Sequence, residues 1–185
     1  VHYSTRIREG DLVEIAAEAD AFPLVEAMYE ACVKAGAHTF WSPKSERLTE
    51  ILLTHGTDAQ IGMLSELSMF QVEKIDARLS IWSPVNTRFL GRVDARKIAL
   101  NQSARRPYLK RFMERAAQEH EGKPGGLRWC GTAFPTMGSA QDAEMSLTQY
   151  AEFVFRAGLL HLPDPIAEWK RVHERQERVR EYLQG

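Results

Sequence analysis

The sequence lacks the glycine-rich loops with which many α/β proteins hold nucleotide phosphates. Neither GxGxxG nor GxxxxGK followed by Ser or Thr occurs in its 185 residues. The turn after the first predicted strand, AAEADAFP at residues 16–23, has no glycine and carries the carboxylates of Glu18 and Asp20. Because these carboxylates would repel a pyrophosphate, we do not expect a nucleotide cofactor.

Cysteine is scarce, charge is balanced, and long apolar runs are missing. Cys32 and Cys130 are the two cysteines and form no CxxC pair, so we expect reduced thiols in a cytoplasmic protein. The 24 Lys and Arg residues balance 25 Asp and Glu residues, which leaves no global field to attract nucleic acid or an anionic membrane. No apolar run approaches the roughly 20 residues of a membrane-spanning helix, and no secretory signal is visible. We therefore expect neither a nucleic-acid nor a membrane partner.

Metal-binding motifs are also missing. No two histidines are spaced i, i+4, and HExxH does not occur. The six histidines are His2, His38, His55, His120, His161 and His173. We predict that this chain by itself supplies no metal ligands.

Four strand-like runs are separated by helical segments. They lie at residues 11–17 (DLVEIAA), 37–42 (AHTFWS), 76–84 (DARLSIWSP) and 126–135 (GLRWCGTAFP). Strands separated by helices of ten or more residues indicate βαβ crossovers, and the third run is typical of a strand covered on both faces. The sequence predicts an α/β fold with a mainly parallel sheet of about four strands. Helices should cover both faces, in a three-layer, Rossmann- or flavodoxin-like arrangement without a nucleotide-binding glycine loop.

Capping residues and helix breakers predict where the helices begin and end. Pro107 lies inside the fourth of them, so a kink or break is expected near Arg106. The helices should run over about 23–36, 45–56, 57–73, 95–120, 146–158 and 164–183.

Cys130 is a candidate nucleophile. A reactive thiol needs a lowered pKa and a base within reach, and no local signature of a cysteine enzyme is present. Cys130 alternates with Trp129 along a predicted strand, so the two should face opposite layers. Because buried cysteine is common, we favour a packing role for Cys130 and for Cys32.

Two charged helices have structural interpretations. The first carries a basic cluster, interpreted as a helix face exposed to water, of Arg105, Arg106, Lys110, Arg111 and Arg115. The last helix carries a narrow apolar seam that should dock on its own sheet or on a neighbouring domain. This seam consists of Ile166, Trp169, Val172, Val179 and Leu183.

The order of the elements and several strings resemble the N-terminal domain of the thermophilic metallo-aminopeptidase family that includes aminopeptidases T and S. The resemblance is carried by their order over nearly the whole chain. The strings are REGDLVEI (8–15), FPLVEAMYEACVKAGA (22–37), TDAQIGML (57–64), VDARKIALNQSARRPYLKRF (93–112), RWCGTAFPTMGSAQDAEMSLTQYAEFVFRAG (128–158) and DPIAEWKRVHERQERVREYL (164–183).

The resemblance implies an exopeptidase that releases N-terminal amino acids from peptides with two divalent metal ions, zinc or cobalt. The family's glutamate, histidine, tyrosine and aspartate ligands belong to a second domain, so no catalytic residue or metal ligand is carried over. Residues 1–185 would then be a single N-terminal α/β domain of a longer polypeptide. Its expected partners are the C-terminal metal-binding domain, the peptide substrate and a second copy in a homodimer.

The end of the fourth strand is the expected contribution to the substrate chamber. Phe134, Pro135 and Thr136 end this strand at its carboxyl side, where such sheets meet their ligands. We expect them to line the chamber wall. Two alternatives stay open: an iron-dependent dioxygenase of the same fold that opens dihydroxypyridine rings, and a docking module without chemistry.

Overall fold

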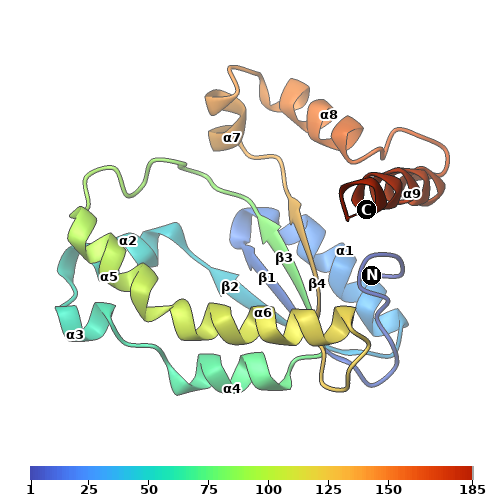
Figure 1. Ribbon diagram of the computed structural model, residues 1–185. Helices are drawn as coiled ribbons and strands as arrows, with labels where there is room; N and C mark the ends of the chain where they lie inside the picture. Colours follow the sequence, from blue (N-terminus) through green and yellow to red (C-terminus); the bar gives the residue numbers. More distant parts are fainter. Residues whose placement is uncertain (185) are drawn as a thin grey trace.

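Four parallel strands in the order β2-β1-β3-β4 form the sheet of the computed structural model, which describes residues 1–184 (Figure 1). The strands are β1 (Leu12–Glu18), β2 (His38–Lys44), β3 (Ala77–Trp82) and β4 (Arg128–Ala133). The predicted α/β class and parallel sheet are confirmed. β2 extends two residues past its predicted end, to Lys44.

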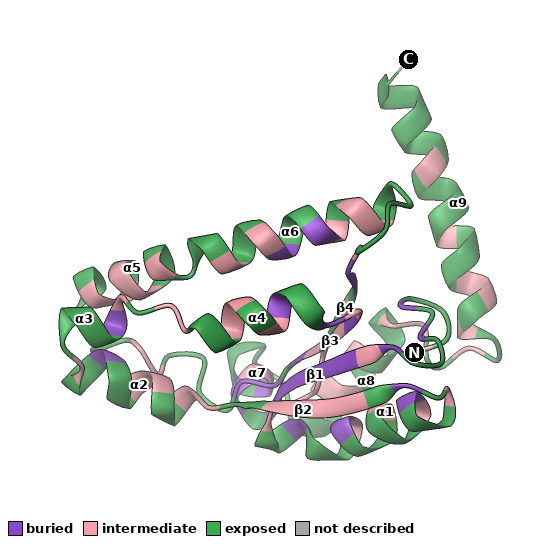
Figure 2. Cartoon of the chain, turned by 90° about the horizontal axis from the view of Figure 1, so that it is seen from below, coloured by how far each residue is buried: buried purple, intermediate pink, exposed green. Residues whose placement is uncertain are grey.

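Helices lie on both faces of this sheet, as predicted. α1 (Phe22–Lys34) covers one face, and α4 (Glu66–Lys74) and α6 (Arg106–His120) lie over the other (Figure 2). From β1 the chain passes to β2 on one side and then crosses back to β3 on the other. The carboxyl ends of β1 and β3 therefore form the switch point at which sheets of this kind bind ligands.

The main core lies between the sheet and α1. Alternate residues of β1 and β3 are buried there against Val25 and Cys32 of α1. Burying each such aliphatic side chain stabilises the fold by about 1.5–3 kcal/mol. The strand residues are Val13, Ile15, Ala17, Ala77, Leu79 and Ile81.

A smaller apolar cluster lies on the opposite face, near the amino ends of the strands. It consists of Val72, Ile75, Phe112 and Leu127. The carboxyl half of this face has no comparable apolar cover from α4 and α6 and carries polar side chains instead.

The expected single helix over 57–73 is two helices. The predicted capping box of Thr57 and Gln60 is present, but α3 (Asp58–Ile61) ends at Gly62. Ser65 then caps α4, with its hydroxyl accepting a hydrogen bond from Leu67 N. Glycine disfavours a helix interior and a serine side chain favours a new start, so the local sequence divides the segment.

The predicted break at Pro107 is confirmed. α5 (Ala95–Ala104) ends at Arg105 and α6 begins at the next residue. A proline ring removes one backbone donor and collides with the preceding turn, which interrupts the helix. Arg105 therefore lies at the junction of two helices. The expected helix over 45–56 is α2 (Glu46–His55), with Ser45 as its cap.

The last three helices extend beyond the carboxyl end of β4 (Figure 1). They are α7 (Met137–Asp142), which was not assigned as a separate helix from the sequence, α8 (Leu147–Ala157) and α9 (Pro165–Gln184). α9 projects from the sheet rather than docking on it, and exposed residues predominate along it (Figure 2). No helix within residues 1–184 combines the length and apolarity needed to cross a membrane.

Candidate functional site

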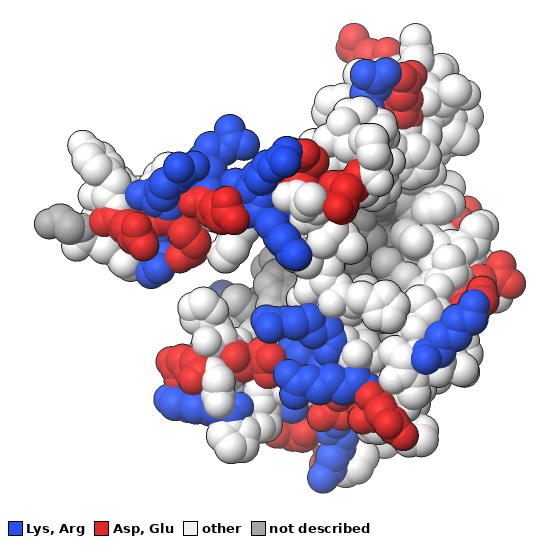
Figure 3. All heavy atoms as spheres, turned by 90° about the vertical axis from the view of Figure 1, so that its right-hand side faces the viewer, with Lys and Arg blue, Asp and Glu red and all other residues white. Residues whose placement is uncertain are grey.

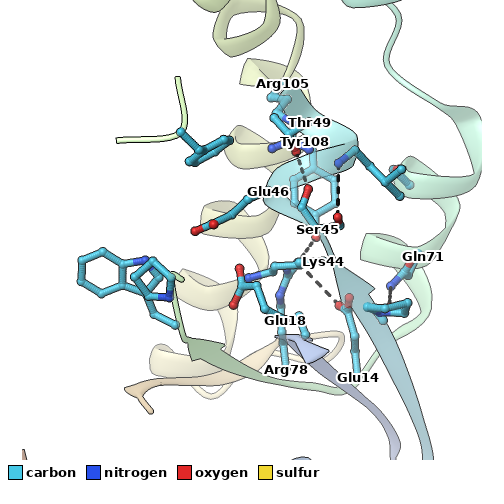
Figure 4. A pocket seen from close by; sticks show the side chains of 18 of the residues that line it. Glu14, Glu18, Lys44, Ser45, Glu46, Thr49, Gln71, Arg78, Arg105 and Tyr108 are labelled. Carbon is cyan, nitrogen blue, oxygen red and sulfur yellow. Dashed lines mark hydrogen bonds and ion pairs between the residues drawn. The ribbon is translucent and has the colours of Figure 1, made fainter. Parts of the chain in front are cut away.

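A cleft of about 820 Å³ opens on the α4 and α6 face, at the carboxyl ends of β1, β2 and β3 (Figure 4). It adjoins the switch point between β1 and β3, and its volume falls within the range of small-molecule sites. The charged side chains that line it are Glu14, Glu18, Lys44, Glu46, Arg78 and Arg105.

Strand alternation accounts for the polar lining. Successive side chains of a strand point to opposite faces, so Val13 and Ile15 enter the core whereas Glu14 faces the cleft. The parallel register places Glu14 opposite Arg78 of β3. This pair was not predicted from the sequence. A charged residue in the middle of each of two apolar strands was the available signal.

Arg78 connects the floor of the cleft to its α6 wall. Its Nη1 lies 3.5 Å from Glu14 Oε2 and donates a hydrogen bond to Tyr108 Oη, and its Nε donates to Ser80 Oγ at 3.2 Å (Figure 4). The guanidinium also lies 5.9 Å from the centre of the Tyr108 ring. Burial raises the pKa of Tyr108, and the side chain of Glu14 is only 4% exposed. Arg78 therefore offsets the cost of burying a carboxylate in the floor.

The other two carboxylates hold the segment after β3 against the cleft. Glu18 Oε2 accepts hydrogen bonds from Ser83 N at 3.2 Å and from Ser83 Oγ at 2.9 Å. Glu46 Oε2 accepts one from Asn86 N at 3.1 Å. Both acids thus have donors from the protein itself.

Two cations of the cleft have no such partner. Among residues 1–184, no carboxylate oxygen lies within 4.0 Å of Lys44 Nζ or of the Arg105 guanidinium. Loss of hydration lowers the pKa of Lys44. Glu18 opposes that shift, whereas the positive charges of Arg78 and Arg105 add to it. Lys44 and Arg105 are therefore the positive charges open to an incoming group.

The predicted wall residues lie beside the cleft rather than in it. Phe134 N donates a hydrogen bond to Trp82 O at 2.9 Å, and the Phe134 side chain packs against the α1 core. Thr136 is buried, donates to Pro84 O and caps α7 by accepting from Ser139 N. These contacts join the ends of β3 and β4. A role for Phe134, Pro135 and Thr136 in a chamber shared with another domain stays a prediction.

Trp129 and Cys130 face opposite layers, as predicted. The Trp129 ring packs edge-on against Phe112 of α6 at 5.9 Å, whereas Cys130 packs against the α1 core. Cys32 is fully buried, and burial raises the pKa of its thiol. Neither cysteine lines the cleft, which supports packing roles for both.

The interpretation of the basic cluster as a water-facing surface was wrong for Arg115. This side chain is buried and donates hydrogen bonds to backbone oxygens on two segments, those of Val72, Ile75, Gly125 and Gly126. Arg115 thereby joins the end of α4 to the turn before β4. A guanidinium can be buried where carbonyl oxygens accept its several N–H groups, a condition that helix periodicity does not reveal.

Two general features bear on the class of ligand. Within the described range, no group of three or more His, Cys, Asp or Glu side chains is placed to hold a metal ion. The prediction that the chain supplies no metal ligands remains a prediction. Basic and acidic side chains interleave on the face seen in Figure 3, so that face presents no continuous basic stripe.

Three comparisons place the chain among known proteins. The sequence model of the thermophilic metalloprotease family (M29) matches residues 1–185. Aminopeptidase 2 of Geobacillus stearothermophilus is 26% identical over 194 residues, which cover 99% of this chain and 45% of that protein. The solved structure of wild-type AmpT from Thermus thermophilus superposes with a TM-score of 0.71 at 18% identity, over 92% of this chain and 43% of that one. The chain thus spans less than half the length of both relatives, and the structural likeness shows the fold alone.

Proposed function

The chain belongs to the thermophilic metalloprotease family (M29), and we propose that residues 1–185 form the N-terminal domain of a metal-dependent aminopeptidase. The observation that carries this proposal is the family match over the whole chain. A similar aminopeptidase supports it, because 99% of this chain aligns with only 45% of that protein. The remainder of such a protein would be the C-terminal domain that holds the metals.

In this proposal the metal ions and the peptide-binding surface belong to different domains. Two divalent ions, zinc or cobalt, would activate a water molecule and polarise the scissile carbonyl from the second domain. The residues of this chain would bind and orient the peptide. The strand end at Phe134, Pro135 and Thr136 is the proposed chamber wall, and its hydrogen bonds to Trp82 and Pro84 would hold it in place.

Exposed apolar side chains on α8 and α9 support the proposal that these helices contact partners. Phe153 of α8 is 57% exposed and Val179 of α9 is 54% exposed. We propose that the C-terminal domain covers part of this surface and that a homodimer contact covers another part. A cytoplasmic location is also proposed, and it rests on the two free cysteines.

Assays of the native protein on leucine and arginine p-nitroanilides test the function. We expect release of p-nitroaniline with added cobalt or zinc, and its loss after chelation. Residues 1–185 alone should give no turnover and no tight zinc binding in calorimetry. Absence of metal-dependent release from the native protein would refute the aminopeptidase assignment. Oxygen uptake with iron(II) and dihydroxypyridine would instead support the ring-cleaving alternative.

A further inference from the structure

We propose that the cleft binds the C-terminal carboxylate of a short peptide substrate between Lys44 and Arg105, with Trp82 contacting the apolar part of that peptide. This inference rests on the proposed aminopeptidase function, because it assigns a binding site to the C-terminal end of the peptide, which an aminopeptidase does not cleave. It concerns residues of this chain alone and requires no metal in this domain.

The charges of the cleft indicate the sign of the ligand. Three carboxylates and three cations line it. Each carboxylate has a partner: Glu14 Oε2 makes an ion-pair contact with Arg78 at 3.5 Å, without a hydrogen bond, whereas Glu18 accepts from Ser83 and Glu46 accepts from Asn86. Among the described residues, Lys44 and Arg105 have no ion-pair partner. The open charges are thus positive and fit an anion.

Positive charges repel one another in this cleft. Loss of hydration is the main cause of the lowered Lys44 pKa, and the charges of Arg78 and Arg105 add to it. An anion placed between Lys44 and Arg105 would remove this repulsion and gain two charge-assisted interactions. A carboxylate suits the pair, because the planar guanidinium can donate to both of its oxygens while the ammonium donates to one.

Both cations are placed by rigid parts of the fold. Lys44 is the last residue of β2, directly before Ser45, whose hydroxyl accepts a hydrogen bond from Leu48 N at 3.2 Å. Arg105 occupies the junction between α5 and α6 that Pro107 enforces. In Figure 4, Arg105 lies near the top of the view, with Tyr108 and Thr49 drawn between it and Lys44. The backbone positions of both cations are thus fixed by regular secondary structure before an anion binds.

The apolar part of the lining points to a peptide rather than to a bare ion. Trp82 is 68% exposed at the end of β3 and forms part of the wall. Further apolar side chains in the lining are Leu48, Leu64, Pro84 and Phe89. At about 820 Å³ the cleft exceeds what a single inorganic ion needs. A carboxylate attached to an apolar side chain, as at the end of a peptide, matches both parts of the lining.

Binding of a small probe tests the site without catalysis. In isothermal titration of the native protein, N-acetyl-phenylalanine should bind at least about tenfold more tightly than N-acetyl-phenylalanine amide, which lacks the charge. Lys44→Met and Arg105→Met should each remove most of this preference, and Lys44→Arg should restore part of it. Arg106→Met is the matched control, because Arg106 is exposed and lies outside the cleft. Equal binding of acid and amide, or unchanged preference in both Met variants, would overturn the proposal. Competition by inorganic phosphate as strong as that by the acid would also overturn it, because the site would then be a general anion site.

Kinetics separate a failure of this inference from a failure of the function. With the metal-loaded native protein, the KM for leucyl-phenylalanine should be several-fold lower than the KM for leucyl-phenylalanine amide, at similar kcat. Lys44→Met and Arg105→Met should bring the two KM values together, whereas Arg106→Met should not. If wild-type protein cleaves leucine p-nitroanilide but treats acid and amide alike, only the carboxylate site is refuted. If it cleaves no p-nitroanilide, the proposed function itself has failed.

Discussion

Asp11 and Arg128 form an ion pair that closes the N-terminal segment onto the sheet. Arg128 Nη2 lies 2.7 Å from Asp11 Oδ1, and Arg128 Nη1 donates hydrogen bonds to Thr5 O at 3.3 Å and to Arg6 O at 2.8 Å. Both side chains are largely buried. The pair therefore connects three segments: the first residues, the start of β1 and the start of β4. Removing one partner would leave the other charge buried without compensation.

The pH dependence of stability at Asp11 follows from its shifted pKa. Burial favours the neutral acid, but the hydrogen bonds from Arg128 and Arg8 and the charge of Arg128 outweigh it, so the pKa is lowered. The ionised Asp11 therefore stabilises the folded state fully above the ordinary carboxyl pKa of the unfolded chain. This stabilisation is lost as the pH falls through the lowered pKa of Asp11 in the folded state. We expect Asp11→Asn to lower the free energy of unfolding by about 3 kcal/mol at neutral pH, and the difference to shrink in acid. Urea unfolding between pH 7 and pH 3 measures this.

A control at the surface separates this effect from general acid unfolding. Asp58 pairs with Arg96 but is solvent-exposed, so Asp58→Asn should change stability little at any pH. A difference between wild type and Asp11→Asn that stays constant down to acid pH would contradict the role assigned to the ion pair.

At the scale of single elements, α7 is attached to the rest of the fold by a close backbone approach. A Cβ atom added to Gly138 would lie 2.3 Å from Val85 O and 2.7 Å from Val85 C. Thr136, which caps α7, also donates to Pro84 O. The start of α7 thus packs directly on the segment after β3, which Glu18 and Glu46 hold from the other side.

Substitution of Gly138 tests this attachment. Because Val85 backbone atoms cannot move aside as a flexible side chain would, Gly138→Ala should destabilise the protein by about 1–3 kcal/mol. Gly131→Ala in β4 is the matched control, since nothing lies within 4 Å of its added Cβ, and its stability should be nearly unchanged. Thermal or urea unfolding of both variants compares them. Equal stability would show that α7 can shift without cost.

The elements also show which features a sequence of this kind can predict. Helix caps were predicted correctly, because a cap depends on residues at most three positions away. The confirmed caps are Ser45, Thr57, Ser146 and Asp164. The division of 57–73 into two helices was equally local, and Gly62 with Ser65 was the overlooked signal. The breaker Pro107 gave the position of the α5–α6 junction.

Features that depend on residues distant in the sequence were not predicted. Glu14 and Arg78 are opposite each other only because of the sheet register. Arg115 is buried where the carbonyl groups of Val72 and Ile75, about 40 residues away in sequence, and of the turn at 125–126 accept its hydrogen bonds. Both long-range and local features form the cleft, because the sheet register places its floor and the local helix junction places Arg105. The strand end at residues 134–136, predicted as a chamber wall, lies outside the cleft that the ends of β1, β2 and β3 line, and its role stays a prediction.

At the scale of the whole molecule, the apolar surface is unevenly distributed. The sheet and its flanking helices bury two apolar clusters, whereas α8 and α9 have no buried residues among those described. The exposed fraction is large at Phe153, Phe155, Ile166 and Val179. Isolated helices gain little stability in water without packing of an apolar face. The arrangement of α8 and α9 is thus consistent with a surface that another domain or a second copy covers.

Dye binding and stability measurements test this coverage. Residues 1–185 alone should bind an apolar dye such as ANS strongly, and the native protein should bind it much less. Phe153→Ser and Val179→Ser should reduce dye binding by the isolated chain with little effect on its unfolding, because both side chains are exposed there. In the native protein each should cost up to about 1.5–3 kcal/mol if the side chain is buried by a partner. Leu109→Ser on α6 is the control, since Leu109 is 58% exposed and lies outside this surface. Equal dye binding by the two forms, together with equally small costs for all three substitutions, would show that α8 and α9 stay uncovered.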